Sequence, residues 1–234
     1  MKPVAVFFLF TISSAFAVTV KPVSTEKYID KILVFPEPSV NTYAVMTPLK
    51  PLNLKAFTLC MRVATELSGY REVILFAYRT KDHDELNVWR EKDGRLSLYL
   101  RSSSECVKFR VPELGALTTH LCLTWDSKTG ATTIFMNGQK SLTKIYRKGH
   151  TIEAGGTVVL GQDPDSYLGH FDSYQSFVGE ISDVDMWSYV RPDTAMVDMA
   201  NSRGKNQIVR GNVINWATGN LKLFGNVYAL NHLL

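Results

Sequence analysis

The chain has 234 residues, of which 45% are hydrophobic and 21% are charged. Its 26 Lys and Arg residues nearly balance 22 Asp and Glu residues. This balance excludes the strong positive charge that is typical of proteins binding nucleic acid or anionic membranes. The length suits one large domain built mainly from β-strands.

The first 17 residues have the layout of a secretory signal peptide. Lys2 precedes an apolar run from Val4 to Phe10, and small residues before and at Ala17 provide a cleavage site. The run is much shorter than the roughly 20 residues that a membrane-spanning helix needs. We therefore expect a secreted chain without membrane insertion, in which residues 18–234 form a single domain.

Alternation of apolar and polar residues predicts β-strands through most of the chain. The proline-bearing segment 34–51 is expected to be irregular. From Ala56 to Val63, every second residue is apolar, as in a strand with one buried face. Further runs of strand character follow at 73–78, 86–89, 96–100, 121–125, 132–136, 158–160 and 181–187.

Two dipeptides predict tight hairpin turns between these strands. Asp93-Gly94 and Asn137-Gly138 contain residue types that tolerate the positive φ angles of such turns. Many short strands joined by short turns favour an all-β fold, a two-sheet antiparallel sandwich.

One segment predicts a single helix. Residues 192–201 begin with Pro and acidic residues, carry Met196, Val197 and Ala200 at helical spacing, and end near Gly204. This apolar side is expected to pack on a sheet.

Three cysteines, Cys60, Cys106 and Cys122, follow the signal peptide. A secreted chain favours pairing two of them, and the sequence alone leaves all three pairings open. Their spacing fits no zinc motif.

An acidic segment from Gln162 to Gln175 contains carboxylates and amides but no Lys or Arg. Asp163 and Asp165 lie two positions apart, so both can face one ion, and the Pro164 carbonyl lies between them. Calcium takes six to eight oxygen ligands of these kinds. The spacing and the lack of flanking helices exclude an EF-hand, and the alternative is a solvated acidic loop.

The segment His120–Ser127 reads His-Leu-Cys-Leu-Thr-Trp-Asp-Ser, which matches the pentraxin signature His-x-Cys-x-Ser/Thr-Trp-x-Ser/Thr at every specified position. Further matching stretches are Phe35-Pro36, 55–60, 160–162, 175–179, Met186-Trp187 and Asn215-Trp216. The chain thus resembles the short pentraxins over nearly all of residues 18–234.

This resemblance implies a jelly-roll, lectin-like sandwich that assembles as a homo-oligomeric ring, usually of five subunits. It implies one intrachain disulfide, between Cys60 and Cys122, and a single helix on the face away from the ligand. Cys106 departs from the family pattern, and we expect it to pack internally or to bond another chain.

The resemblance also implies two calcium ions per subunit. Their ligands would be Asp163, the Pro164 carbonyl, Asp165, Asp172 and Gln175, with one residue of an earlier loop. Two alignments of that loop are open, giving Asp84 or Asp82, and we favour Asp84. Because Asp163 is one methylene shorter than the Glu of the best-known members, we expect one ion to bind more weakly.

In one branch of the family, a phosphate bridges the calcium ions and a choline group occupies a neighbouring slot. The corresponding positions here are Val88, Tyr99 and approximately Glu105. Tyr99 either narrows the slot or offers its ring to a quaternary ammonium group. Phosphocholine or a related phosphorylated or anionic surface group is the expected ligand.

An enzyme is the first alternative, because 180–185 resembles the acidic strand of jelly-roll glucan hydrolases. A second glutamate is missing, and Glu180 points away from Asp183 and Asp185 in a strand. We therefore expect no enzymatic activity. The second alternative is a calcium-dependent lectin of the laminin-G or legume type, which binds polysaccharide.

The sequence thus predicts a secreted, calcium-dependent pattern-recognition protein of innate immunity. By resemblance alone, its opposite face would recruit complement or phagocyte receptors. No nucleic-acid partner is expected.

Overall fold

A computed structural model describes residues 31–69, 71–202 and 209–231. The predicted signal peptide and the predicted helix end near Gly204 lie outside these residues. No helix within the described ranges is long and apolar enough to cross a membrane.

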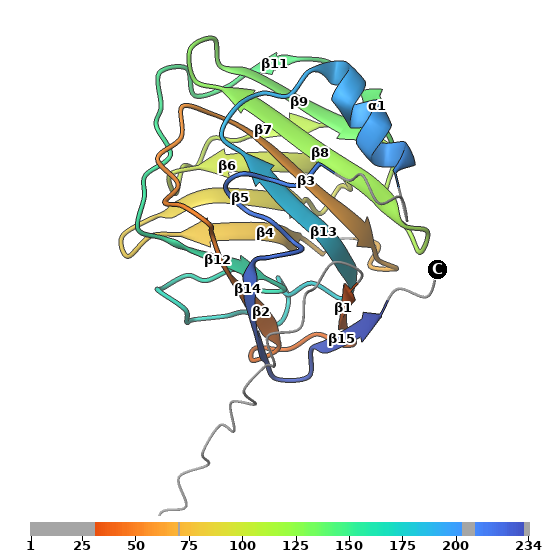
Figure 1. The fold of residues 1–234 in the computed structure, drawn as a ribbon. Coiled ribbons are helices and arrows are strands. Elements are labelled where there is room, and N and C mark those ends of the chain that lie inside the picture. The colour runs from red at the N-terminus through yellow and green to blue at the C-terminus, as the bar shows by residue number, and fades with distance from the viewer. Residues whose placement is uncertain (1–30, 70, 203–208, 232–234) are drawn as a thin grey trace, which may run out of the picture.

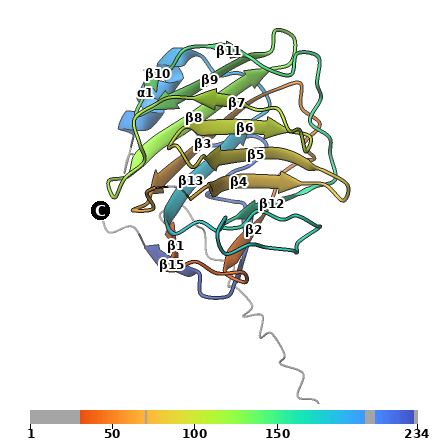
Figure 2. The same cartoon turned by 180° about the vertical axis from the view of Figure 1, so that it is seen from behind.

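The described chain folds into two antiparallel sheets that pack face to face (Figures 1 and 2). The eight-stranded sheet runs in the order β10-β9-β8-β3-β13-β1-β15, with β11 paired to β9. Its strands are β1 Lys31–Phe35, β3 Ala56–Ala64, β8 Thr119–Asp126, β9 Ala131–Met136, β10 Gln139–Lys140, β11 Lys144–Ile145, β13 Gly179–Trp187 and β15 Tyr228–Asn231.

The second sheet has seven strands in the order β14-β2-β12-β4-β5-β6-β7. These strands are β2 Tyr43–Thr47, β4 Val73–Arg79, β5 Asp84–Arg90, β6 Leu96–Leu100, β7 Val107–Phe109, β12 Thr157–Leu160 and β14 Asn220–Phe224. The predicted two-sheet sandwich is confirmed. The expectation that 34–51 is irregular is wrong at the end of β1 and at β2. In β2, Ala44 and Met46 are buried in the core, as alternation in a strand requires.

The core lies between the sheets and is built by alternating side chains. Phe57, Leu59, Met61 and Val63 on β3 are each at most 1% exposed, as their spacing predicts. Full burial of one such side chain contributes about 1.5–3 kcal/mol of favourable transfer free energy, which conformational entropy opposes.

Both predicted hairpin turns are present. Asp93-Gly94 joins β5 to β6, and Gly94 has a φ of +78°. Asn137-Gly138 joins β9 to β10, with φ angles of +49° and +81°. Two successive positive φ angles are the pattern for which Asn-Gly is preferred.

The single helix of the described chain, α1 (Asp193–Asn201), lies against the outer side of the eight-stranded sheet (Figure 1). Its buried residues are Ala195, Met196 and Met199, whereas Val197 is 46% exposed. The predicted helix is therefore confirmed, but its buried side is centred on Met196 and Met199. These two methionines contact a cluster that contains Trp187, Phe135 and the cysteines of the disulfide.

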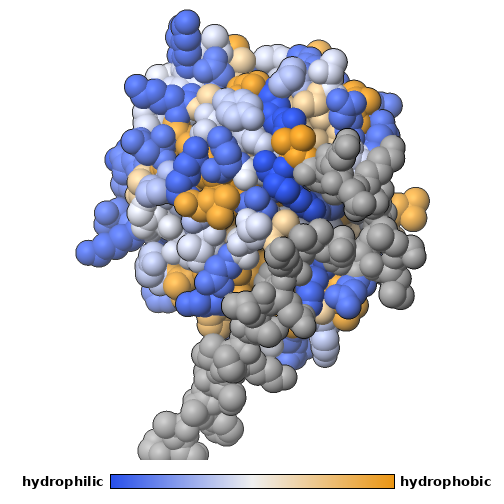
Figure 3. All heavy atoms as spheres, viewed as in Figure 1, coloured by the Kyte–Doolittle hydropathy of each residue, from blue (hydrophilic) through white to orange (hydrophobic). Residues whose placement is uncertain are grey.

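The Cys60–Cys122 disulfide implied by the family resemblance is confirmed. The two residues are direct register partners on β3 and β8. Cys106 is free and partly buried. Seen from the α1 side, apolar side chains appear as separate spots among polar ones (Figure 3), and scattered apolar residues of this kind are normal on a protein surface.

A buried group of charges ties the outer side of β13 to neighbouring segments. Arg210 donates to Asp183 at 2.8 Å and to Asp185 at 2.9 Å, and Arg62 lies 3.3 Å from Asp183. Asp185 also accepts the backbone N–H groups of Gly211 and Trp216. These carboxylates are engaged in ion pairs and hydrogen bonds, so they do not form the exposed acid pair that glycoside hydrolysis needs.

Candidate metal centre

The acidic loop lies between β12 and β13, over the outer face of the seven-stranded sheet. That face carries an apolar cluster of Ile74, Ala77, Trp89 and Val159, with Tyr43 and Tyr99 packed against it. From the loop, the Phe171 ring contacts Tyr43 at 4.8 Å between centroids. The loop is thus anchored on the sheet by an aromatic contact.

Hydrogen bonds to backbone carbonyl groups hold the second half of this loop. The Arg71 guanidinium donates to the carbonyls of Tyr174 at 2.6 Å and of Ser176 at 2.8 Å, and it also contacts the Ser173 carbonyl. The Phe177 N–H donates to the Gly161 carbonyl at 3.0 Å and closes the base of the loop. The loop therefore has a defined shape set by the chain itself.

Asp163 is the most enclosed carboxylate of the loop, with 6% of its surface exposed. Asn87 Nδ2 on β5 donates to its Oδ1 at 2.8 Å. Burial, followed by the nearby charges of Asp84 and Asp165, raises the pKa of Asp163 to about 7. Burial is the largest cause of this rise, and the two neighbouring carboxylates add to it against the opposing effect of Arg79.

The earlier loop contributes Asp84, at the start of β5. Its carboxylate contacts the Arg79 guanidinium, and its backbone N–H donates to Ser102 Oγ at 2.8 Å. Thr80 and His83 close a tight turn, and Asp82 is exposed on that turn. Of the two alternatives left open by the sequence, Asp84 is the one close enough for its charge to act on Asp163.

Two side-chain amides complete the centre. Oδ1 of Asn87 and Oε1 of Gln175 are both buried without a hydrogen-bond partner. Such an oxygen costs about 1–3 kcal/mol of unfolding free energy unless a partner is supplied. Both residues line a pocket of about 290 Å³ together with Asp84. Sequence reasoning missed Asn87, although a lone amide within an apolar strand was the available signal.

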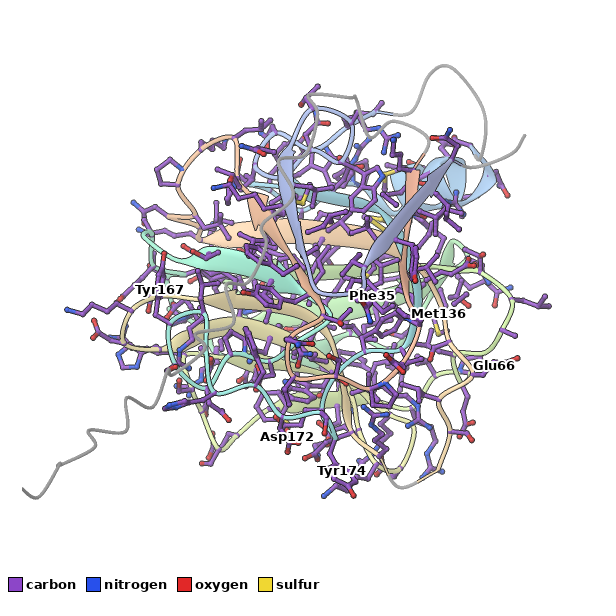
Figure 4. The ribbon with its side chains drawn as sticks, turned by 90° about the horizontal axis from the view of Figure 1, so that it is seen from below. Phe35, Glu66, Met136, Tyr167, Asp172 and Tyr174 are labelled. Atoms are coloured by element: carbon purple, nitrogen blue, oxygen red, sulfur yellow. A yellow bond between two sulfur atoms is a disulfide. The ribbon has the colours of Figure 1, made fainter. Side chains whose placement is uncertain are left out.

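The remaining predicted ligands lie at the rim. Pro164 is buried, whereas Asp165 and Asp172 are exposed. Asp172 Oδ1 accepts the Tyr174 N–H at 2.8 Å. In Figure 4, Asp172 and Tyr174 lie at the lower edge, on the side away from α1.

The donor set fits calcium, because it consists of carboxylate, amide and carbonyl oxygens. A divalent cation, together with the Arg79 guanidinium, would balance the three carboxylates of Asp84, Asp163 and Asp165. Among the described residues, no three carboxylates of this centre bring their oxygens within 4.8 Å of one another. The ligands are thus gathered from two loops in an open arrangement.

The sequence pattern described as the Pentaxin family matches residues 31–230. The chain belongs to the pentraxin family. It is 55% identical to C-reactive protein of Danio rerio over 197 residues, which cover 84% of this chain and 87% of that protein. It is 38% identical to human serum amyloid P-component over 200 residues, covering 84% and 85% of the two chains.

Among solved structures, the chain is similar to a native heptameric SAP-like pentraxin from Limulus polyphemus. The TM-score is 0.73 at 26% identity, and the match covers 87% of this chain and 96% of the Limulus chain. The jelly-roll sandwich expected for a pentraxin is thereby confirmed.

The slot beside the pentraxin metal centre differs from the sequence expectation. Val88 is 1% exposed and packs in the core between the sheets, so the structure does not bring it to the pocket. Its neighbours Asn87 and Trp89 line the pocket instead. A shift of one residue reverses the face of a strand, which accounts for the difference.

Of the other two slot residues, Tyr99 lines the pocket and the exposed Glu105 does not. The Tyr99 hydroxyl donates to Glu91 Oε1 at 3.0 Å. Burial alone raises the pKa of Glu91, but hydrogen bonds from Lys108, Ser97 and Tyr99 outweigh it and lower that pKa overall. Glu91 is therefore an ionised carboxylate at the pocket, and Glu72 also lines it.

Proposed function

We propose that this pentraxin is a secreted, calcium-dependent pattern-recognition protein of innate immunity. The observation that carries the proposal is the pair of buried, unpartnered oxygens of Asn87 and Gln175 beside the charge-crowded Asp163. Two calcium ions would coordinate these unpartnered oxygens and balance the negative charge around Asp163. The proposed ligands are Asp84, Asp163, the Pro164 carbonyl, Asp165, Asp172 and Gln175, with Asn87 as an added oxygen donor.

The proposed target is a phosphorylated or other anionic group on microbial or damaged-cell surfaces, with phosphocholine as the leading candidate. Calcium when bound supplies positive charge that attracts anionic oxygens. The pocket next to Asp84 and Gln175 presents Trp89, Tyr99 and the Glu91 carboxylate. Aromatic faces and a carboxylate suit the cationic end of such a ligand.

We further propose assembly into a homo-oligomeric ring, most simply of five subunits, and recruitment of complement or phagocyte receptors. Several sites on one face would raise the affinity for a surface through multivalency. The Limulus relative, which is heptameric, supports a ring without fixing the number of subunits.

The metal site is tested by calorimetric titration with calcium. We expect at least one saturable site that is lost in Asp163→Ala/Asp165→Ala, because the variant removes two of the clustered carboxylates. Asp84→Ala should weaken binding, while the matched variant Asp82→Ala, on the exposed turn, should leave it unchanged. Unchanged calcium binding in the double variant would contradict the site.

The ligand is tested by retention on immobilised phosphocholine with calcium and release by a chelator. A matched polysaccharide resin separates the two binding classes. Retention on polysaccharide alone would favour the calcium-dependent lectin over the proposed ligand.

A further inference from the structure

A second group of side chains of the types that can ligate a metal lies beneath α1, on the sheet opposite the acidic loop. Cys60 and Cys122 are register partners, and His120 precedes Cys122 by two residues on the same face of β8. Among the described residues, these three form the one group of at least three His, Cys, Asp or Glu residues whose ligand atoms lie within 4.8 Å of one another. All three residues are at most 5% exposed.

One distance in this group matches a tetrahedral zinc site, although the two sulfurs are bonded to each other in the oxidised chain. Zinc binds thiolate sulfur at about 2.3 Å and imidazole nitrogen at about 2.0–2.1 Å, so tetrahedral angles separate sulfur and nitrogen by about 3.6 Å. Cys122 Sγ lies 3.6 Å from His120 Nε2. The two sulfurs would need to be about 3.8 Å apart by the same reasoning, so their bond must first be broken and their side chains must rotate apart.

Charge and surroundings also suit such an ion. Two thiolates neutralise a divalent cation, and a neutral imidazole ligand adds no charge. The nearby Arg62 guanidinium is paired with Asp183 at 3.3 Å. Met196 and Met199 of α1, with Phe135 and Trp187, enclose the group in an apolar shell.

We propose that, after reduction of the disulfide, Cys60, Cys122 and His120 bind one thiophilic divalent cation such as Zn²⁺. A phosphine or a dithiol supplies the two electrons. With a phosphine, water provides the oxygen of the phosphine oxide and the two thiol protons, and metal binding then releases both protons. A water molecule would take the fourth position, as in other sites with three protein ligands.

This site is separate from the calcium centre in sequence, sheet and chemistry, and it does not rest on the proposed function. The sequence hides it because the cysteines lie 62 residues apart, outside any zinc-motif spacing. Only the pairing of β3 with β8 brings the histidine and both sulfurs together.

The test uses the full chain in a Cys106→Ser background, so that the odd thiol cannot contribute. The protein is reduced with a phosphine, freed of reductant under anaerobic conditions and titrated with Co²⁺ as a spectroscopic substitute for Zn²⁺. We expect one Co²⁺ per chain, with sulfur-to-cobalt charge-transfer bands and the intense visible bands of tetrahedral cobalt. The oxidised protein should show neither set of bands.

His120→Gln keeps both cysteines and should weaken cobalt binding by more than about 100-fold, because loss of an outer-shell partner alone costs about 10–100-fold. The matched control His170→Gln removes an exposed histidine and should bind cobalt as the parent does. If reduction unfolds the protein, added metal should restore its near-ultraviolet circular dichroism. No cobalt bands, equal bands in His120→Gln, or equal binding in concentrated urea would each overturn the proposal.

Discussion

Two groups of charged residues lie on opposite outer faces of the sandwich, and they are compensated differently. Beneath α1, the carboxylates of Asp183 and Asp185 are matched by the guanidinium groups of Arg62 and Arg210. At the proposed calcium loop, which is the acidic segment from Gln162 to Gln175, Asp163 and Asp165 lie close to Asp84, with Arg79 as the nearby cation.

The difference separates a structural cluster from the cluster that we propose to bind calcium. A buried charge group whose members pair with one another holds its segments together and needs nothing from solvent. A group that keeps excess negative charge and orphan oxygens is incomplete without a cation. Whether buried charges are paired internally therefore serves as a physical criterion for the role of a cluster, and both clusters can be tested against it.

The largest effect is expected from breaking the compensated cluster. Asp185→Ala leaves Arg210 with one partner fewer and removes the acceptor of two buried backbone N–H groups. We expect a loss of about 3–5 kcal/mol of unfolding free energy, the usual cost of breaking a buried ion pair. Urea unfolding measures it, and Glu180→Ala on the same strand is the exposed control. A loss below 1 kcal/mol would show that this cluster does not hold β13 in place.

The two faces should change the unfolding free energy in opposite directions as the pH falls, and this effect is smaller than that of Asp185→Ala. His120, with its pKa lowered by burial to about 4, binds fewer protons when folded than when unfolded between pH 4 and 6.5. Its contribution to stability is therefore present above pH 6.5 and is lost as the pH falls, by up to about 3 kcal/mol. Asp163 acts oppositely in calcium-free protein, because its raised pKa makes the folded state bind the extra proton.

Urea unfolding of oxidised protein in chelator, at pH 7 and pH 5, tests this sign. His120→Gln should lose less stability on acidification than the parent, and Asp163→Asn should lose more. Equal pH dependence of all three proteins would contradict the assignment of opposite signs to the two faces.

How far the sequence predicts these faces depends on whether the signal is local. Alternation along β3 and the Asn137-Gly138 turn are local, and both predictions are confirmed. The predicted helix is confirmed, but its buried side is shifted by one residue from the predicted side. Met196 fits either phase, and only packing against Trp187 and Phe135 selects Met199 over Val197.

The site was harder to predict because β5 is buried on both faces. Residues 86–89 are all buried, since the calcium loop covers the outer side of the sheet. Without an exposed face, alternation does not reveal that Asn87 points toward Asp163 and Val88 toward the core. The excess charge at Asp163 likewise depends on two loops meeting in space.

The smallest expected effect concerns Arg79, the cation of the incomplete cluster. Its guanidinium pairs with Asp84 and lowers the pKa of Asp163 against the effect of burial. A cation at this place competes with calcium for Asp84 and repels the ion. Arg79→Ala should therefore strengthen calcium binding by about tenfold, which is the scale of one partly screened charge near the surface. Arg79→Lys retains the charge and should bind calcium nearly as the parent does.

Calorimetric titration of the parent, Arg79→Ala and Arg79→Lys with calcium tests this prediction. Weaker calcium binding in Arg79→Ala would mean that the guanidinium positions Asp84 for the ion, and the calcium face would then depend on internal pairing much as the face beneath α1 does.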